Sequence, residues 1–240
     1  MMGTKNLIDE PFPDIPNCEL YLCGGPVRDK LLDLPIKDRD FVVLTEMSFD
    51  ELCSEIEKIG TIFVKEPDFF TIRCRINKEA IDIAFPRGES GYRDGRHPDH
   101  VIKVGTLKED GSRRDFTINS MFMSSSGEIL DYFEGQQDLK QGIIRTVGDP
   151  KERFSEDYLR IIRAVRFSAK LNFHIEGYVK QAMIKEAKNL SKISSERVKD
   201  ELNIALKYNP GLTISYVEEL NLWGILHKMG LNFQLTNAHI

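Results

Sequence analysis

The chain has 240 residues, of which 41% are hydrophobic and 30% are charged. This length fits one large domain or two modest ones, and the composition argues against disorder. No run approaches the roughly 20 apolar residues of a membrane span. Met1–Pro16 carries acids and prolines instead of a basic and an apolar segment, so we expect no signal peptide and a cytoplasmic location. The four cysteines lack CxxC spacing, which favours reduced thiols over disulfides or a zinc site.

The net charge of −5 hides an asymmetry along the chain. Residues 140–200 contain 14 Lys and Arg against 8 Asp and Glu, whereas the other residues contain 19 against 30. A basic segment in an acidic chain can present a positive face to a polyanion such as a nucleic acid. It can equally be the solvated face of a helix, and charge alone does not separate these interpretations.

The first sixty residues alternate between strand and helix patterns. Glu19–Cys23 is a short apolar run that predicts a strand, and it leads into the turn Gly24-Gly25. Pro26–Asp33 predicts a short helix with proline at its first position. Arg39–Leu44 predicts a second strand. Ser48 to Gly60 fits an amphipathic helix with Ser48 as N-cap and the glycine at its end.

Residues 61–132 continue the mixed pattern. Three strands are expected in runs rich in β-branched residues, namely Thr61–Lys65, Phe69–Ile76 and Ala80–Phe85. Pro86–His100 is rich in Gly, Arg, Asp and Pro and predicts a loop. Phe116–Met123 fits either a helix or a strand, and Ile129–Tyr132 predicts one more strand.

After Pro150 the pattern becomes helical, without a strand signal. Helices are expected over Ser155–Leu171 with Ser155 as N-cap, over Tyr178–Leu190, over Ser194–Tyr208, and once or twice between Leu212 and Met229. We therefore place a domain boundary near residue 150. Residues 1–150 form the α/β part, and residues 151–240 form the helical part.

The turn Gly24–Asp29 is a candidate phosphate site. Its two glycines let the backbone approach a ligand, and the N–H groups at the start of the following helix suit an anion. Arg28 adds a cation one turn into that helix. The same glycines can also serve only strand–helix packing. The segment matches neither the Walker nor the GxGxxG pattern.

Asp38 and Asp40 open a predicted strand and are candidate metal ligands. Residues i and i+2 of a strand point to the same face, so both carboxylates can reach one or two hard cations such as Mg²⁺. Two such ions can clamp the attacking and leaving oxygens of a phosphoryl displacement. A solvated turn is the alternative. Asp82 lies between two isoleucines of a later strand and is either an exposed edge residue or a third ligand.

Gly24–Asp29 followed by Asp38-x-Asp40 resembles motif A of the class II tRNA nucleotidyltransferase and bacterial poly(A) polymerase family, within the DNA polymerase β-like superfamily. The resemblance covers roughly residues 19–230, in order and with family-like spacing. It continues through Arg113–Met121, Asp131–Asp138, Ile144–Asp149, Arg153–Arg160 and Ile193–Arg197. It implies an α+β fold in which a polymerase β-like head with a mixed sheet precedes an all-helical neck.

The resemblance also implies roles for individual residues. Asp38 and Asp40 would be catalytic and would hold Mg²⁺. The nucleotide would contact the glycine turn and the ribose-reading motif through charge-assisted hydrogen bonds. The residues implied for this contact are Gly25, Arg28, Arg113, Arg114, Asp115 and Asn119.

A second implied site reads the base through Asp157 and Arg160. A carboxylate only accepts hydrogen bonds and a guanidinium only donates them. Cytosine and adenine both offer an amino donor beside a ring-nitrogen acceptor, so this pair would accept CTP and ATP and reject UTP and GTP. Arg163 and Arg166 continue the stripe and would approach phosphates. The alternative is a ladder of salt bridges along the helix.

The implied function is addition of C, A or both from CTP and ATP to the 3′ end of tRNA, with release of pyrophosphate. The alternatives are an A-adding enzyme, a poly(A) polymerase, or a catalytically silent RNA- or nucleotide-binding module that needs a partner chain. The segment Pro86–Pro98 matches the family's flexible loop, associated with the switch from C to A addition. Pro26 and Ser120 depart mildly from the family pattern.

Members of the family commonly carry further helical regions that grip tRNA. This chain would therefore be a fragment, dimerise, receive RNA grip from a second chain, or act on a small substrate.

Overall fold

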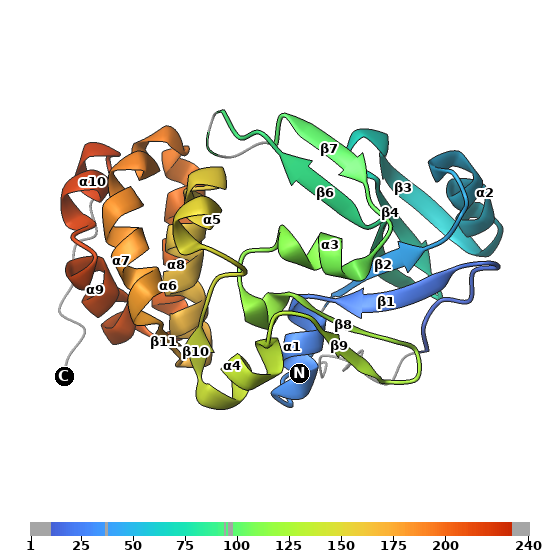
Figure 1. Cartoon of the computed structure of the whole chain (residues 1–240), viewed down its shortest axis with the longest axis horizontal. Coiled ribbons are helices and arrows are strands. Elements are labelled where there is room, and N and C mark those ends of the chain that lie inside the picture. The colour runs from blue at the N-terminus through green and yellow to red at the C-terminus, as the bar shows by residue number, and fades with distance from the viewer. Residues whose placement is uncertain (1–10, 37, 94, 96–97, 232–240) are drawn as a thin grey trace. The chain divides into compact units, whose positions relative to one another are not determined.

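The computed structural model describes residues 11–36, 38–93, 95 and 98–231. These form two compact units (Figure 1), one from residues 11–90 with 99–141 and one from residues 91–98 with 142–231. The domain boundary near residue 150 stays a prediction. Residues 1–10, most of the segment in which no signal peptide is expected, lie outside the described residues. Within the described ranges no helix is long and apolar enough to cross a bilayer.

The first unit is built on a seven-stranded mixed sheet with the strand order β3-β4-β5-β2-β1-β8-β9. Neighbouring strands are antiparallel except β2 and β5, which are parallel. The strands are β1 Glu19–Cys23, β2 Arg39–Leu44, β3 Gly60–Glu66, β4 Thr71–Ile76, β5 Glu79–Ala84, β8 Met121–Met123 and β9 Ile129–Asp131. The expected strands and the mixed sheet are confirmed.

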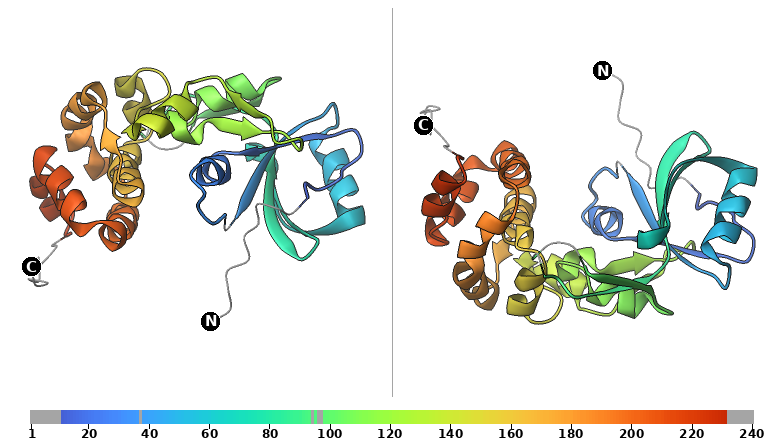
Figure 2. Two further views of the ribbon diagram at one scale, coloured as in Figure 1. Left: turned by 90° about the horizontal axis from the view of Figure 1, so that it is seen from below. Right: turned by 90° about the horizontal axis from the view of Figure 1, so that it is seen from above.

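The α-helices of this unit are short. They are α1 Gly25–Leu31, α2 Phe49–Ile59, α3 Leu107–Ser112 and α4 Gly135–Gln141. Ser48 caps α2 as expected, in a capping box with Glu51. The buried side of α2, with Leu52 and Ile56, covers one face of β3 and β4 (Figure 2). Gly60 ends α2 in an extended conformation and begins β3.

Two expectations for residues 86–123 need correction. The segment Pro86–His100 is not all loop, because β6 Arg87–Ser90 pairs antiparallel with β7 His100–Lys103 in a separate two-stranded sheet. The glycine and charged residues of this segment are typical of a loop, so its composition did not indicate the two strands. Phe116–Met123 contains both open alternatives, a 3₁₀ turn η3 (Thr117–Asn119) and then β8.

The second unit is mainly helical. Its helices are α5 Pro150–Glu156, α6 Leu159–Leu171, α7 Gly177–Glu186, α8 Ser195–Tyr208, α9 Pro210–Glu219 and α10 Trp223–Lys228, with a 3₁₀ segment η4 Ala187–Lys192. The strands β10 Ile143–Ile144 and β11 His174–Ile175 pair in parallel, so the region is not helical throughout.

The prediction of a single helix over Ser155–Leu171 is wrong. Asp157 has extended backbone angles (φ −143°, ψ 103°) and separates α5 from α6. Ser155 lies inside α5, and Asp149 is the N-cap, accepting hydrogen bonds from the backbone N–H groups of Lys151 and Glu152. The apolar pattern runs through the break because both helices bury a face in the same core, for example Phe154 and Ile162.

Candidate active site

The turn after β1 is held by backbone contacts. Gly24 has φ +71° and ψ −127°, a conformation that side chains rarely adopt. Its N–H donates to the carbonyl of Met121 over 3.1 Å. The helix α1 begins at Gly25, directly behind this turn, and spans seven residues. The chain therefore reverses from the middle of the sheet into a short helix beside η3.

Arg28 connects this turn to the predicted ribose-reading motif. The side chain is 4% exposed. Its Nη1 donates to Asn119 Oδ1 over 2.5 Å, and its Nε donates to Asp29 Oδ1 over 2.8 Å. The Asn119 amide donates in turn to Asp115 Oδ1 over 3.0 Å. The structure thus brings together four sequence-predicted residues, Gly25, Arg28, Asp115 and Asn119, within the first unit.

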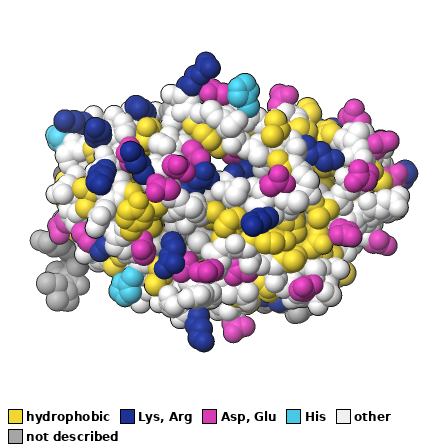
Figure 3. Space-filling view, in the orientation of Figure 1, with side chains coloured by type: hydrophobic (Ala, Val, Ile, Leu, Met, Phe, Trp, Pro, Cys, Tyr) yellow, Lys and Arg dark blue, Asp and Glu magenta, His cyan; other side chains and the backbone are white. Residues whose placement is uncertain are grey.

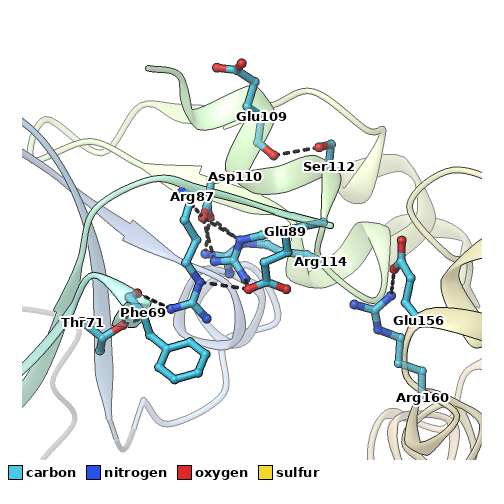
Figure 4. A network of polar contacts seen from close by, with 11 residues as sticks. Phe69, Thr71, Arg87, Glu89, Glu109, Asp110, Ser112, Arg114, Glu156 and Arg160 are labelled. Atoms are coloured by element: carbon cyan, nitrogen blue, oxygen red, sulfur yellow. Dashed lines mark hydrogen bonds and ion pairs between the residues drawn. The ribbon is translucent and has the colours of Figure 1, made fainter. Parts of the chain in front are cut away.

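A fully buried carboxylate, Asp110, orients both arginines of the motif. Its Oδ1 accepts Nε and Nη2 of Arg113 over 3.0 and 2.7 Å, and its Oδ2 accepts Nε and Nη2 of Arg114 over 3.1 and 2.9 Å. Oε1 of Glu89, on β6, joins Arg113 to Arg87 through bonds of 2.9 Å each. Figure 4 shows Arg87 and Glu89 beside Asp110 and Arg114. Burial alone would raise the pKa of Asp110, but the two guanidinium groups and their hydrogen bonds hold it below its usual value.

The predicted metal acids lie at the start of β2 and on β5. Asp38 and Asp40 are both exposed, whereas Arg39 between them is buried against Glu79. Asp40 is the register partner of Asp82 across the parallel pair β2–β5. The strand alternation therefore places Asp40 and Asp82 on one face of the sheet, and Asp38 directly precedes β2. Phe41 and Ile83 are buried on the opposite face, while Val42, on the face of Asp40, packs in a buried cluster with Leu107 and Phe122.

Asp40 is electrostatically strained. Although it reaches solvent, protein atoms surround its carboxylate, and this desolvation is the largest of the causes that raise its pKa to about 6. The negative charges of Asp82 and Asp38 contribute to the rise in pKa, while Arg114 and Arg73 oppose it. A cation at this place would stabilise the ionised form.

Carboxylate oxygens are the ligands that Mg²⁺ prefers, and Asp38 and Asp40 offer them at the start of β2. The residues present thus fit a hard divalent cation. As the side chains are placed, no three His, Cys, Asp or Glu residues in the described part of the chain converge closely enough to hold an ion. Asp82 instead binds Arg73.

In the second unit the predicted base-reading residues have different partners. Nη1 of Arg160 donates to Glu156 Oε2 over 2.6 Å and to the Arg153 carbonyl over 3.0 Å (Figure 4). Asp157 Oδ1 accepts the backbone N–H of Leu159 over 2.9 Å. Asp157 therefore shapes the start of α6, and Glu156 orients Arg160.

Arg163 and Arg166 extend along α6 toward α8. Both form ion pairs with Glu201 of α8, and both lie over the ring of Phe167. Basic and acidic side chains are interspersed over the face in Figure 3. Part of the positive charge of residues 140–200 therefore forms ion pairs between helices. Contact of Arg163 and Arg166 with phosphates stays a prediction.

The loop 91–98 includes a close contact within the second unit. The Gly95 carbonyl accepts the backbone N–H of Tyr158 over 3.2 Å. A Cβ atom on Gly95 would lie 2.3 Å from Tyr158 Cε2. This contact requires glycine at position 95.

A profile of the poly A polymerase head domain matches residues 20–145, more than half of the chain. The chain belongs to the poly(A) polymerase head-domain family. A second family, described as the probable RNA and SrmB-binding site of polymerase A, matches residues 172–227. The head-domain match contains the glycine turn, the three acids and the Asp110 cluster.

The curated relatives of this head-domain chain include CCA-adding enzymes. That of Lactobacillus helveticus is 44% identical over 76% of this chain and 45% of its own length. That of Leuconostoc mesenteroides is 42% identical over 92% of this chain and 58% of its own length. The chain therefore spans about half the length of the curated relatives it matches.

Solved structures of this family share the fold. The Bacillus stearothermophilus CCA-adding enzyme in complex with CTP has a TM-score of 0.72 and 31% identity, over 90% of this chain and 49% of that one. The Thermotoga maritima CCA-adding enzyme complexed with tRNA has a TM-score of 0.71 and 30% identity, over 92% and 50%. The predicted head with a mixed sheet and a helical neck is confirmed.

Sequence reasoning missed the acids that orient the arginines. Asp110 precedes Arg113 and Arg114 by three and four residues, which is the spacing of neighbours on a helix. These ion pairs could therefore have been predicted from the sequence. Glu156 and Arg160 show the same spacing. No local signal marks the pairing of Glu89 with Arg113 or of Arg73 with Asp82, because these partners lie in separate segments or strands.

Proposed function

We propose that this chain transfers nucleotidyl groups from CTP and ATP to the 3′ hydroxyl of tRNA, forming the CCA end and releasing pyrophosphate. The observation that carries the proposal is the pair Asp40 and Asp82, which lie in register on one sheet face of a poly(A) polymerase head domain beside Asp38. The 42–44% identity to CCA-adding enzymes supports the tRNA substrate and the two nucleotides.

Asp38 and Asp40 are proposed to hold Mg²⁺, with Asp82 as a third candidate ligand. When bound, the ion would activate the attacking hydroxyl and stabilise the charge that develops on the phosphate. Asp40 already faces two negative neighbours, so it is the carboxylate whose charge most needs compensation. The strand β2 that carries it pairs with both β1 and β5.

The triphosphate and ribose are proposed to lie against Gly25, Arg28 and the motif Arg113–Asn119. The side chains of Arg113 and Arg114 are each 18% exposed, and Asp110 anchors both guanidinium groups. A guanidinium held by a buried carboxylate loses little side-chain entropy when an anion binds. Asp115 and Asn119 hold the polar chain that orients Arg28.

Asp157 and Arg160 are proposed to select C and A, with Glu156 positioning Arg160. The Arg160 side chain is 10% exposed and is held at one end by Glu156. Arg163 and Arg166 are proposed to approach phosphates of nucleotide or primer. The RNA is proposed to receive additional contacts from a second copy or another chain.

The test is incorporation of each radiolabelled nucleotide in the presence of Mg²⁺, with tRNA ending before CCA, after C and after CC. The proposal expects C followed by A, with the activity lost in Asp40→Ala. Incorporation of A alone on the CC end would indicate an A-adding enzyme. Long A runs would indicate a poly(A) polymerase, which the description of the matching family also favours. Nucleotide or RNA binding without any incorporation would favour a silent module.

A further inference from the structure

Three charged residues lie in register across neighbouring strands on one face of the sheet. In the strand register, Arg73 of β4 is paired with Asp82 of β5, and Asp82 is paired with Asp40 of β2. Nε and Nη2 of Arg73 donate to the two Asp82 oxygens over 2.6 and 2.7 Å. Nη1 of the same guanidinium bonds to none of the described residues. A permanent cation thus occupies both oxygens of an acid that adjoins Asp40.

We propose that Arg73 is a built-in competitor of the divalent cation at Asp82. It holds this carboxylate away from metal coordination until the ion displaces at least one of its two hydrogen bonds. Arg73 thereby sets the concentration of divalent cation that the chain requires. The inference rests on the proposed metal role of the acids.

The ion pair between Arg73 and Asp82 is specific in geometry and can be displaced by another cation. A bidentate guanidinium–carboxylate pair is specific, but the Arg73 side chain is 55% exposed, so solvent screening keeps the pair weak. Asp82 is 29% exposed, so a cation can reach its oxygens from solvent. A divalent ion on Asp82 would repel the adjacent guanidinium, so the two cations compete for the charge of this carboxylate.

Arg75 provides a matched control for this interaction. It lies two residues further along β4 on the same face, is exposed, and pairs in register with Ala80 rather than with an acid. Among the described residues its side chain has no hydrogen-bond or ion-pair partner. Arg75→Gln therefore removes one positive charge from the same face and leaves Asp82 bonded to Arg73.

The experiment titrates the full chain with Mn²⁺, without nucleotide or RNA, and follows free Mn²⁺ by electron paramagnetic resonance. Arg73→Gln is expected to tighten binding about fivefold, the equivalent of an exposed ion pair. Arg75→Gln should change binding by less than about twofold, as expected for a screened charge. In an Asp82→Asn background, Arg73→Gln should have no further effect.

Three outcomes would overturn the inference. They are Mn²⁺ binding by Arg73→Gln no tighter than wild type, an equal gain in Arg75→Gln, and a gain in Arg73→Gln that survives Asp82→Asn. Asp40→Asn distinguishes failure of the inference from failure of the proposed metal site. If Mn²⁺ binding is unchanged in Asp40→Asn, the proposed metal role and the inference are both contradicted. If Mn²⁺ binding is lost in Asp40→Asn but unchanged in Arg73→Gln, the inference alone is overturned.

Discussion

A Cβ atom on Gly24 would lie 2.9 Å from Nη1 of Arg114. The turn after β1 and the predicted ribose-reading motif are therefore in direct contact, although ninety residues of chain separate them. Arg114 cannot withdraw freely, because Asp110 holds its Nε and Nη2. The absence of a side chain at position 24 is what allows the arginine to occupy this place.

Gly24→Ala is expected to lower the free energy of unfolding by about 3 kcal/mol, because it adds backbone strain at φ +71° and displaces a tethered guanidinium. Thermal unfolding followed by circular dichroism measures the loss. Gly127→Ala is the control, since Gly127 also has positive φ but would place its Cβ in open space. It should cost only about 1 kcal/mol. Equal losses would show that the Arg114 contact does not matter.

Asp110→Asn is expected to lower the free energy of unfolding by about 3 kcal/mol, because it removes the buried counter-charge that Arg114 and Arg113 share and leaves Arg113 paired with Glu89. The folded-state pKa of Asp110 is lowered, so its stabilisation is complete above its unfolded pKa and is lost as the pH falls through the folded value. The loss in the variant should therefore shrink in acid. Denaturant unfolding at pH 7 and pH 3 measures it.

Glu109→Gln is the control for Asp110→Asn. Glu109 neighbours Asp110 but is exposed and serves the capping box with Thr106. Its replacement should cost at most about 1 kcal/mol. A similar loss in both variants would contradict the orienting role of Asp110.

Asp40→Asn is expected to stabilise the metal-free protein at neutral pH. The folded-state pKa of Asp40 is raised to about 6. The stabilisation of the folded state by protonated Asp40 is therefore complete below the unfolded-state pKa and is lost as the pH rises through about 6. Because Asp40 is solvent-exposed, water screens the repulsion, and the free energy of unfolding is expected to rise by only about 1 kcal/mol. Melting curves in a chelator at pH 4 and pH 7.5 test this. A gain of equal size at both pH values would contradict the assignment.

Asp157→Asn is expected to reduce discrimination of CTP over UTP by about tenfold or more, because the amide can also donate to the wrong base edge. Competition between the two nucleotides in single-turnover incorporation measures the ratio. Glu156→Gln should change the ratio less and mainly lower the rate, since Glu156 acts through Arg160. Unchanged selectivity in Asp157→Asn would remove this residue from base reading.

Local patterns were sufficient for the elements whose hydrogen bonds lie close in sequence. Ser48 and Glu51 form a capping box three residues apart, and the apolar runs of β1 and β2 show their strand character directly. The glycine turn, the acids Asp38 and Asp40, and the family resemblance were equally visible, because each depends on residue types at short spacing.

Tertiary structure decided which charges meet. The order β4-β5-β2 places Arg73, Asp82 and Asp40 in one row, and no local spacing encodes that register. The break at Asp157 was also decided there, because α5 and α6 bury their faces in one core and the apolar period runs through both. Pairing between strands depends on the assembled sheet, whereas caps and turns depend on a few neighbouring residues.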